Sequence, residues 1–198
     1  MICIFMISGS HFTKYISYNS SWIQELKKYH YVVKNSSLAD LNILLRDCQQ
    51  FVNTCQDKFP NPKIGVMGIS SGGYFALRLK KMIPRLQFCI GIAPVINPQR
   101  RKQLLQQLPS SKLTQKLKEV IRATPSVRKI YNKIDSETLI IVSRKDIQVP
   151  LEIFDEYQIP NLVVLENQGH NITQNVNLEM MKVIKSFLRS LGNKKNII

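Results

Sequence analysis

The sequence predicts a three-layer α/β sandwich, in which a mostly parallel sheet of about six strands carries helices on both faces. Short continuous apolar runs alternate with amphipathic segments of helical length from one end of the chain to the other. The apolar runs lack the polar alternation of a half-exposed strand, which is typical of parallel strands buried on both faces. A length of 198 residues, with 44% hydrophobic and 21% charged residues, favours one domain over residues 1–198.

The elements expected from these patterns follow one another in regular alternation. The strands are Ile2–Ile7, Tyr31–Val33, Ile64–Met67, Leu86–Ala93, Thr138–Val142 and Leu162–Leu165. The helices are Ser21–Tyr29, one that starts at Ser37 with Asp40 completing a capping box, Tyr74–Met82, Leu151–Tyr157 and Val176–Leu191. Since active sites of such sheets form at the carboxyl ends of the strands, the loops that follow the strands should carry the functional residues.

The stretch Lys63–Leu77, KIGVMGISSGGYFAL, contains the pattern Gly-x-Ser-x-Gly between an apolar run and a helix. A serine on so sharp a turn exposes its hydroxyl above the sheet edge, and the close packing around it favours glycine two positions on either side. Centring the pattern on Ser71 would place Ile69 where the first glycine belongs. Ser70 is therefore the candidate nucleophile, and the competing interpretation is a plain serine in a strand-to-helix turn.

A serine nucleophile needs a base, and the base needs an acid that orients it. The chain has three histidines, of which His30 precedes a strand and His11 lies in the loop after the first strand. His170 follows the last strand and is the candidate base. Asp146 is the one carboxylate in the loop 143–149 and is the candidate acid. The alternative is a surface histidine and a solvated acid without a shared function.

The segments GISSGG, KDIQVP and NQGHNI, with Ser, Asp and His in that order on successive strand ends, resemble the α/β-hydrolase superfamily over nearly the whole chain. The resemblance implies that Ser70 attacks an acyl carbonyl, that His170 takes and returns the proton, and that Asp146 fixes the tautomer of the imidazole. It also implies an oxyanion hole made by the backbone N–H groups of Ser71 and Ser10.

The chain departs from that family's pattern in two places. Ser8-Gly9 stands where many relatives have His-Gly, and His11 is displaced, which leaves the second oxyanion donor open. The family's usual antiparallel leading strands have no counterpart, so the sheet should be small.

By this resemblance the protein cleaves an ester, thioester or amide through an acyl-serine intermediate, most simply as a carboxylesterase-like enzyme. The motifs do not separate an esterase from a peptidase or an acyltransferase. An alternative of another class is a non-catalytic binding protein with this fold that holds an anionic partner. No cofactor is expected, because the sequence has no metal-ligand cluster, phosphate loop or dinucleotide fingerprint.

The segment between the expected strands Leu86–Ala93 and Thr138–Val142 is too long for a simple connection. Its residues 97–134 are expected to form a basic helical cap above the nucleophile. Gln99–Lys133 holds ten Lys and Arg but one acid, Glu119, which accounts for nine of the fifteen net positive charges. Two amphipathic helices separated by Pro109–Ser111 are expected there. The charge could select an anionic small-molecule acyl substrate, contact an anionic lipid surface, or form an ordinary solvated face. Nucleic acid is the least favoured partner, since Tyr131 is the only aromatic residue in the stretch.

A cytoplasmic location is expected from three features. The four cysteines lie in apolar contexts without CxxC spacing, as buried free thiols of a reducing compartment do. The apolar start MICIFMIS has no basic flank, and no stretch approaches the length of a transmembrane helix.

Overall fold

The computed structural model describes residues 1–8, 24, 26, 31–36, 40–109, 134–170 and 178–193. Its strands form one six-stranded sheet in the order β2-β1-β3-β4-β5-β6, and every neighbouring pair is parallel. The strands are β1 (Ile2–Ile7), β2 (Tyr31–Ser36), β3 (Lys63–Ile69), β4 (Phe88–Ile92), β5 (Thr138–Ser143) and β6 (Asn161–Leu165). The predicted α/β class and the six-stranded parallel sheet are thus confirmed.

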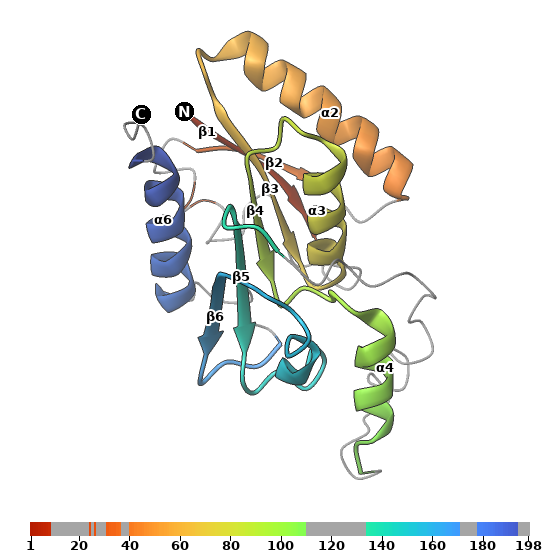
Figure 1. The fold of residues 1–198 in the computed structure, drawn as a ribbon. Coiled ribbons are helices and arrows are strands. Elements are labelled where there is room, and N and C mark those ends of the chain that lie inside the picture. Colours follow the sequence, from red (N-terminus) through yellow and green to blue (C-terminus); the bar gives the residue numbers. More distant parts are fainter. Residues whose placement is uncertain are drawn as a thin grey trace.

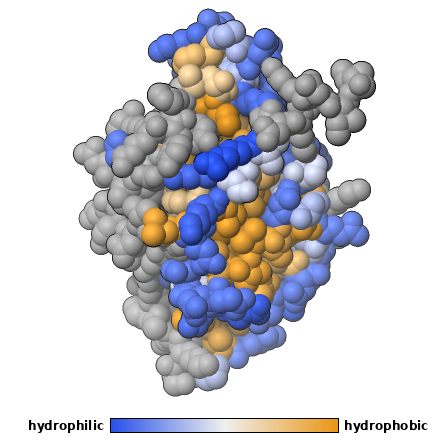
Figure 2. Space-filling view, turned by 90° about the vertical axis from the view of Figure 1, so that its left-hand side faces the viewer, coloured by the Kyte–Doolittle hydropathy of each residue, from blue (hydrophilic) through white to orange (hydrophobic). Residues whose placement is uncertain are grey.

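Helices cover both faces of this sheet (Figure 1). The helices α2 (Leu41–Lys58) and α3 (Ser71–Met82) lie on one face, and α6 (Leu178–Asn193) lies on the other. The helix α4 (Pro98–Gln106) extends beyond the carboxyl ends of the strands. Seen from the side of α6, the surface shows an area of hydrophobic residues bordered by hydrophilic ones (Figure 2).

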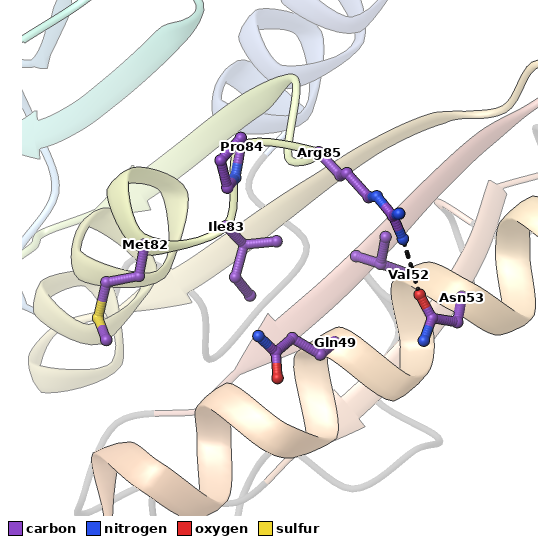
Figure 3. A pocket seen from close by; sticks show the side chains of 7 residues that line it. All are labelled: Gln49, Val52, Asn53, Met82, Ile83, Pro84 and Arg85. Atoms are coloured by element: carbon purple, nitrogen blue, oxygen red, sulfur yellow. Dashed lines mark hydrogen bonds between the residues drawn. The ribbon is translucent and has the colours of Figure 1, made fainter.

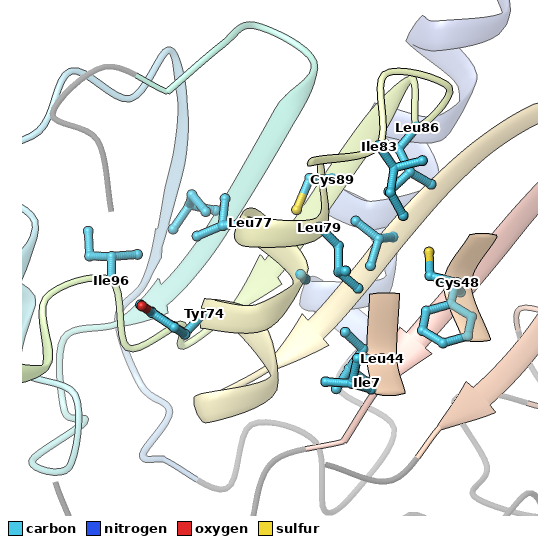
Figure 4. Close-up of a cluster of buried hydrophobic side chains, with 14 of the residues drawn as sticks. Ile7, Leu44, Cys48, Tyr74, Leu77, Leu79, Ile83, Leu86, Cys89 and Ile96 are labelled. Atoms are coloured by element: carbon cyan, nitrogen blue, oxygen red, sulfur yellow. The ribbon is translucent and has the colours of Figure 1, made fainter. Parts of the chain in front are cut away.

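Side chains of each central strand enter two separate cores, because successive residues of a strand point to opposite faces. In β1, Cys3, Phe5 and Ile7 pack with α2 and α3, whereas Ile4 and Met6 pack with α6. Figure 4 shows the first of these cores, where side chains from α2, α3 and β4 meet over the sheet. Burial on both faces explains why the strands read as unbroken apolar runs.

The start of α2 corrects one expectation. The helix begins at Leu41, and its N-cap is Asp40, whose carboxylate accepts a hydrogen bond of 2.8 Å from the backbone N–H of Asn42. Ser37, which the sequence favoured as the first residue of this helix, lies outside the described residues. Both residue types cap helices well, so the choice between them depends on where the packed face of the helix begins.

Two further expectations were wrong in extent. Of the expected helix Leu151–Tyr157, only a single 3₁₀ turn, η2 (Leu151–Ile153), forms. The strand expected over Leu86–Ala93 is shorter, since β4 runs from Phe88 to Ile92. Leu86 and Ala93 are nevertheless buried.

Some expectations fall largely on parts of the chain outside the described ranges. Of the expected helix Ser21–Tyr29, the structure describes Gln24 and Leu26, both helical. The second cap helix falls entirely on residues 110–133. Among the described helices, none is both long and apolar enough to cross a membrane.

The order of the strands places the site. Since β1 pairs with both β2 and β3, the chain leaves β1 toward one side of the sheet and returns on the other. At such a switch point the loops after two neighbouring strands diverge and leave room for a ligand at the carboxyl ends. The loop after β3 is the one that carries Ser70.

Candidate active site

Ser70 occupies the turn between β3 and α3 with a strained backbone. Its φ of 53° and ψ of −119° lie outside the regions that a residue with a side chain normally adopts. Such a conformation costs on the order of 1–3 kcal/mol and persists only where the surroundings enforce it. The turn therefore has the strained backbone that the sequence pattern of the elbow predicts.

The glycines on either side are required by close backbone packing. A Cβ on Gly68 would lie 2.1 Å from the carbonyl oxygen of Gly72, and a Cβ on Gly72 would lie 2.4 Å from the carbonyl oxygen of Ile7. Neither clash could be relieved by turning a side chain, because both neighbours are backbone atoms. The spacing of glycines in the motif thus follows directly from the approach of α3 to β1 and β3.

Hydrogen bonds to the backbone of Ser70 hold the strained turn. Its N–H donates to the carbonyl of Ile92 at 2.8 Å. Its carbonyl accepts from the N–H groups of Gly73 and Val95, at 3.0 and 3.2 Å. The end of β4 and the loop that follows it therefore fix the nucleophile candidate on both sides.

Asp146 and His170 form a buried pair. Oδ2 of Asp146 lies 2.8 Å from Nδ1 of His170, and their side chains are 1% and 9% exposed. Oδ1 of Asp146 accepts hydrogen bonds from the backbone N–H groups of Gln148 and Val149, at 2.8 and 2.9 Å. A carboxylate held at both oxygens orients the imidazole and favours the tautomer with its proton on Nδ1.

Further contacts join the acid loop (Ser143–Val149) to the histidine loop (Glu166–His170). Arg144 makes a double hydrogen bond with Glu166, with Nε–Oε2 and Nη2–Oε1 distances of 2.7 and 3.1 Å. This ion pair raises the pKa of Arg144 and lowers the pKa of Glu166. Ser143 donates its hydroxyl hydrogen bond to the carbonyl of Gln168. The two loops therefore form one connected unit.

The helix α4, the described part of the expected cap, carries a cation whose charge interacts with that of Asp146. Arg101, in the first turn of α4, is half-buried, and desolvation of its guanidinium lowers its pKa to about 10, while the charge of Asp146 acts in the opposite direction. The helix itself is anchored by Asn97, whose Oδ1 caps the N–H of Arg100 at 3.0 Å. The sequence showed the charges of residues 97–134 but gave no signal that Arg101 would be half-buried.

The structure describes one of the two expected oxyanion donors. Ser71 is the first residue of α3, so its N–H lies at the positive end of the helix dipole, next to Ser70. Ser10 lies outside the described residues. The preceding Ser8 is buried and its carbonyl oxygen would lie 2.9 Å from a Cβ on Gly72, so the loop after β1 starts directly beside the elbow.

The three residues of the candidate triad all follow strands at the same edge of the sheet. The structure brings Asp146 and His170 into contact and places Ser70 at the end of β3. The approach of His170 Nε2 to Ser70 Oγ stays a prediction. Sequence reasoning missed Ser143, although a serine at the end of the apolar run TLIIVS was a visible signal.

One pocket lies away from these residues, between α2 and the connection from α3 to β4 (Figure 3). It has a volume of about 380 Å³ and a wall of mixed polarity, with Val52, Ile83 and Pro84 beside the polar side chains of Gln49, Asn53 and Arg85. The guanidinium of Arg85 at its rim donates to Asn53 Oδ1 at 3.0 Å and to Gln56 Oε1 at 3.2 Å. None of the candidate triad residues lines it.

Comparison with solved structures shows that the fold is widespread among hydrolases. Est1E from Butyrivibrio proteoclasticus shares 16% identity at a TM-score of 0.63, over 98% of this chain and 88% of that one. An esterase from Pyrococcus furiosus shares 18% identity at a TM-score of 0.65, over 95% and 81% of the two chains. A serine hydrolase without lid from Xanthomonas campestris shares 14% identity at a TM-score of 0.61, over 96% and 82%. At these identities the likeness establishes the fold.

Comparison with curated proteins found no match. A family model described as "Serine aminopeptidase, S33" matches residues 34–135, which is just over half of the chain and includes the elbow with Ser70. The match ends before Asp146 and His170. The strained serine turn, the parallel sheet and this match agree, and the chain belongs to the serine hydrolases of the α/β-hydrolase type.

Proposed function

We propose that the protein hydrolyses a small acyl ester through an acyl-Ser70 intermediate. The observation that carries the proposal is the buried pair of Asp146 and His170, 2.8 Å apart, at the sheet edge where Ser70 is held in a strained turn. An ordinary surface histidine would not be oriented by a carboxylate that is itself fixed by two backbone N–H groups.

Each residue of the proposed site has a distinct role. His170, held by Asp146 through Nδ1, presents Nε2 to take the proton of Ser70 as its oxygen attacks the acyl carbon. The N–H of Ser71 donates to the oxyanion of the tetrahedral intermediate, and the N–H of Ser10 is the proposed second donor. His170 then returns the proton to the leaving alcohol, and a water molecule hydrolyses the acyl-enzyme in a second cycle of the same steps.

A fluorophosphonate probe with a fluorescent tag tests the nucleophile directly. Wild type should be labelled, Ser70→Ala should not, and Ser136→Ala should be labelled like wild type because Ser136 is exposed in the turn before β5. Nitrophenyl esters of graded chain length then report the preferred acyl group. A folded wild type that neither reacts with the probe nor turns over any ester would contradict the proposal and favour a non-catalytic binding protein.

A peptidase is the second candidate, because the matching family is described as a serine aminopeptidase. The same triad cleaves amides when the leaving amine is bound and protonated. Aminoacyl nitroanilides with a free amino terminus, assayed beside the nitrophenyl esters, separate the two activities. A kcat/KM for the anilides that exceeds that for the esters would identify the protein as a peptidase.

We further propose that residues 97–134 form a cap that favours acyl substrates with a negative charge. Support comes from the three consecutive cations Arg100, Arg101 and Lys102 in α4 and from the electrostatic interaction of Arg101 with Asp146. Comparing esters with and without a terminal carboxylate tests this, and the preference for the anionic ester should decline as salt is added. Equal kcat/KM for both esters, together with sedimentation on anionic vesicles, would instead indicate contact with a lipid surface.

A further inference from the structure

Ser143 is a polar residue at a fully buried position of β5. Its side chain is 0% exposed and, by the alternation of a strand, shares a face with Leu139 and Ile141, which belong to the core under α6. A hydroxyl buried on such a face without a partner costs about 1–3 kcal/mol. We therefore expect the hydroxyl of Ser143 to have a hydrogen-bond partner that offsets this cost.

Ser143 contacts both loops of the candidate site at once. Its backbone carbonyl accepts from the N–H of Asp146 at 3.2 Å, which closes the turn that carries the acid. Its hydroxyl donates to the carbonyl of Gln168, two residues before His170. One residue thereby links the backbone that holds the acid to the backbone that holds the base.

Apart from the Asp146–His170 pair, two further side-chain contacts between these loops lie at the surface. The side chains of Arg144 and Glu166 are 57% and 58% exposed, and the contact from Lys145 Nζ to Asn167 Oδ1, at 3.3 Å, is exposed as well. Exposed pairs of this kind contribute little in water and are weakened by salt. The hydroxyl of Ser143, by contrast, belongs to a fully buried residue and links the two loops away from these exposed contacts.

We propose that Ser143 is a positioning residue that sets the imidazole of His170 relative to Asp146 and Ser70. The inference rests on the proposed function, in which His170 acts as the base. Without the link to Gln168, the histidine loop keeps only the His170 ring itself as a buried side-chain contact with the acid loop among the contacts described above, and the ring then samples orientations in which Nε2 does not face Ser70. Because a displacement of about 1 Å in a catalytic group can reduce the rate about 100-fold, the effect should appear in kcat.

Three variants separate positioning from mere stability. Ser143→Ala removes the hydroxyl, Ser143→Thr retains it, and Arg144→Met removes the exposed ion pair as a matched control in the same loop. For Ser143→Ala we expect kcat and the rate of fluorophosphonate labelling to fall about 10- to 100-fold with KM changed less than about 2-fold. The Thr variant should recover most of kcat, and Arg144→Met should stay near wild type. Where Ser143→Ala does not fold, Ser143→Cys, with a weak donor of similar size, replaces it.

A proton NMR spectrum gives a readout that does not depend on turnover. The Nδ1–H of a histidine that faces a buried carboxylate resonates far downfield, and its absence in His170→Gln identifies the signal. This signal should persist in wild type, Ser143→Thr and Arg144→Met, and should broaden or vanish in Ser143→Ala.

The outcomes distinguish this inference from the proposed function. Ser143→Ala with a lowered melting temperature but unchanged kcat and an unchanged resonance would overturn the positioning role and leave only a structural one. If wild type proves inactive, the proposed hydrolysis fails, and the Nδ1–H resonance alone then tests whether Ser143 positions His170. Its loss in Ser143→Ala but not in Ser143→Thr supports the positioning of His170, and its persistence in both contradicts it.

Discussion

Gly68→Ala is the substitution whose effect follows most directly from the backbone of the elbow. The added Cβ would lie 2.1 Å from the carbonyl oxygen of Gly72, 2.4 Å from its carbonyl carbon and 2.7 Å from the nitrogen of Gly73. Ordinary contacts of a Cβ begin at 3.4 Å, so the first turn of α3 must move by more than 1 Å. Overpacking of this kind typically costs about 1–3 kcal/mol, and we expect the upper end because all three neighbours are backbone atoms.

Chemical denaturation followed by circular dichroism measures this loss in the free energy of unfolding. For a chain of this length about 3 kcal/mol corresponds to a melting temperature lower by roughly 6–12 °C. Gly169→Ala is the matched control, because a Cβ there meets nothing within 4 Å, and it should change the free energy by less than about 0.5 kcal/mol. If Gly68→Ala were as stable as Gly169→Ala and reacted equally fast with a fluorophosphonate, the described geometry of the elbow would be wrong.

Three further substitutions and reactions test other parts of the molecule. Asp146→Asn removes the charge beside Nδ1 of His170, so kcat for ester hydrolysis should fall about 10³- to 10⁴-fold, and a smaller loss than 10-fold would exclude Asp146 as the acid. Burial raises the pKa of Cys55 to about 12, so a thiol reagent at pH 8 should leave the native protein unlabelled and react once it is denatured; rapid native labelling would contradict the buried position. Leu188→Ala should lower the free energy of unfolding by about 2–5 kcal/mol because Leu188, a residue of α6, is fully buried in the core between this helix and the sheet, while kcat at 25 °C stays near wild type.

The strands were predictable because their physics is local. A strand buried on both faces is apolar at nearly every position, and the apolar runs in β1, β3, β4 and β5 therefore favour strands. The elbow was predictable because its two glycines follow from backbone clashes. The contact between Asp146 and His170 followed from topology, since both loops come from the carboxyl ends of neighbouring strands.

Features that depend on tertiary packing were not predictable. The stretch from Leu151 to Tyr157 has apolar residues at helical spacing, yet Ile153, Phe154 and Tyr157 enter the core from a 3₁₀ turn and a loop. The hydroxyl of Tyr157 donates a hydrogen bond to the carbonyl of Ile96 at 3.5 Å. Burial raises the pKa of Tyr157 to about 12, so the hydroxyl keeps the proton that this hydrogen bond needs. A pattern of apolar positions shows that side chains are buried but not which backbone delivers them.

The assembly of the site depends on one pair of neighbouring strands. Ser70 is fixed to β4, through the carbonyl of Ile92 and the N–H of Val95, whereas Asp146 and His170 are carried by the loops that follow β5 and β6. The two halves meet where β4 pairs with β5, with Ile92 opposite Ile141. The last hydrogen bond of this pairing runs from the N–H of Ala93 to the carbonyl of Ile141, at 2.7 Å.

A slip of one residue in that register would move the acid and the base together by about 3.3 Å relative to the nucleophile, which is the rise per residue of a parallel strand. The internal geometry of the Asp146–His170 pair would survive such a slip, because the acid and histidine loops are joined to each other. Ala93 stands at the junction with a positive φ of 44°, so the chain accepts local strain where the register is fixed. The proposed triad therefore depends on the β4–β5 register as well as on its three side chains.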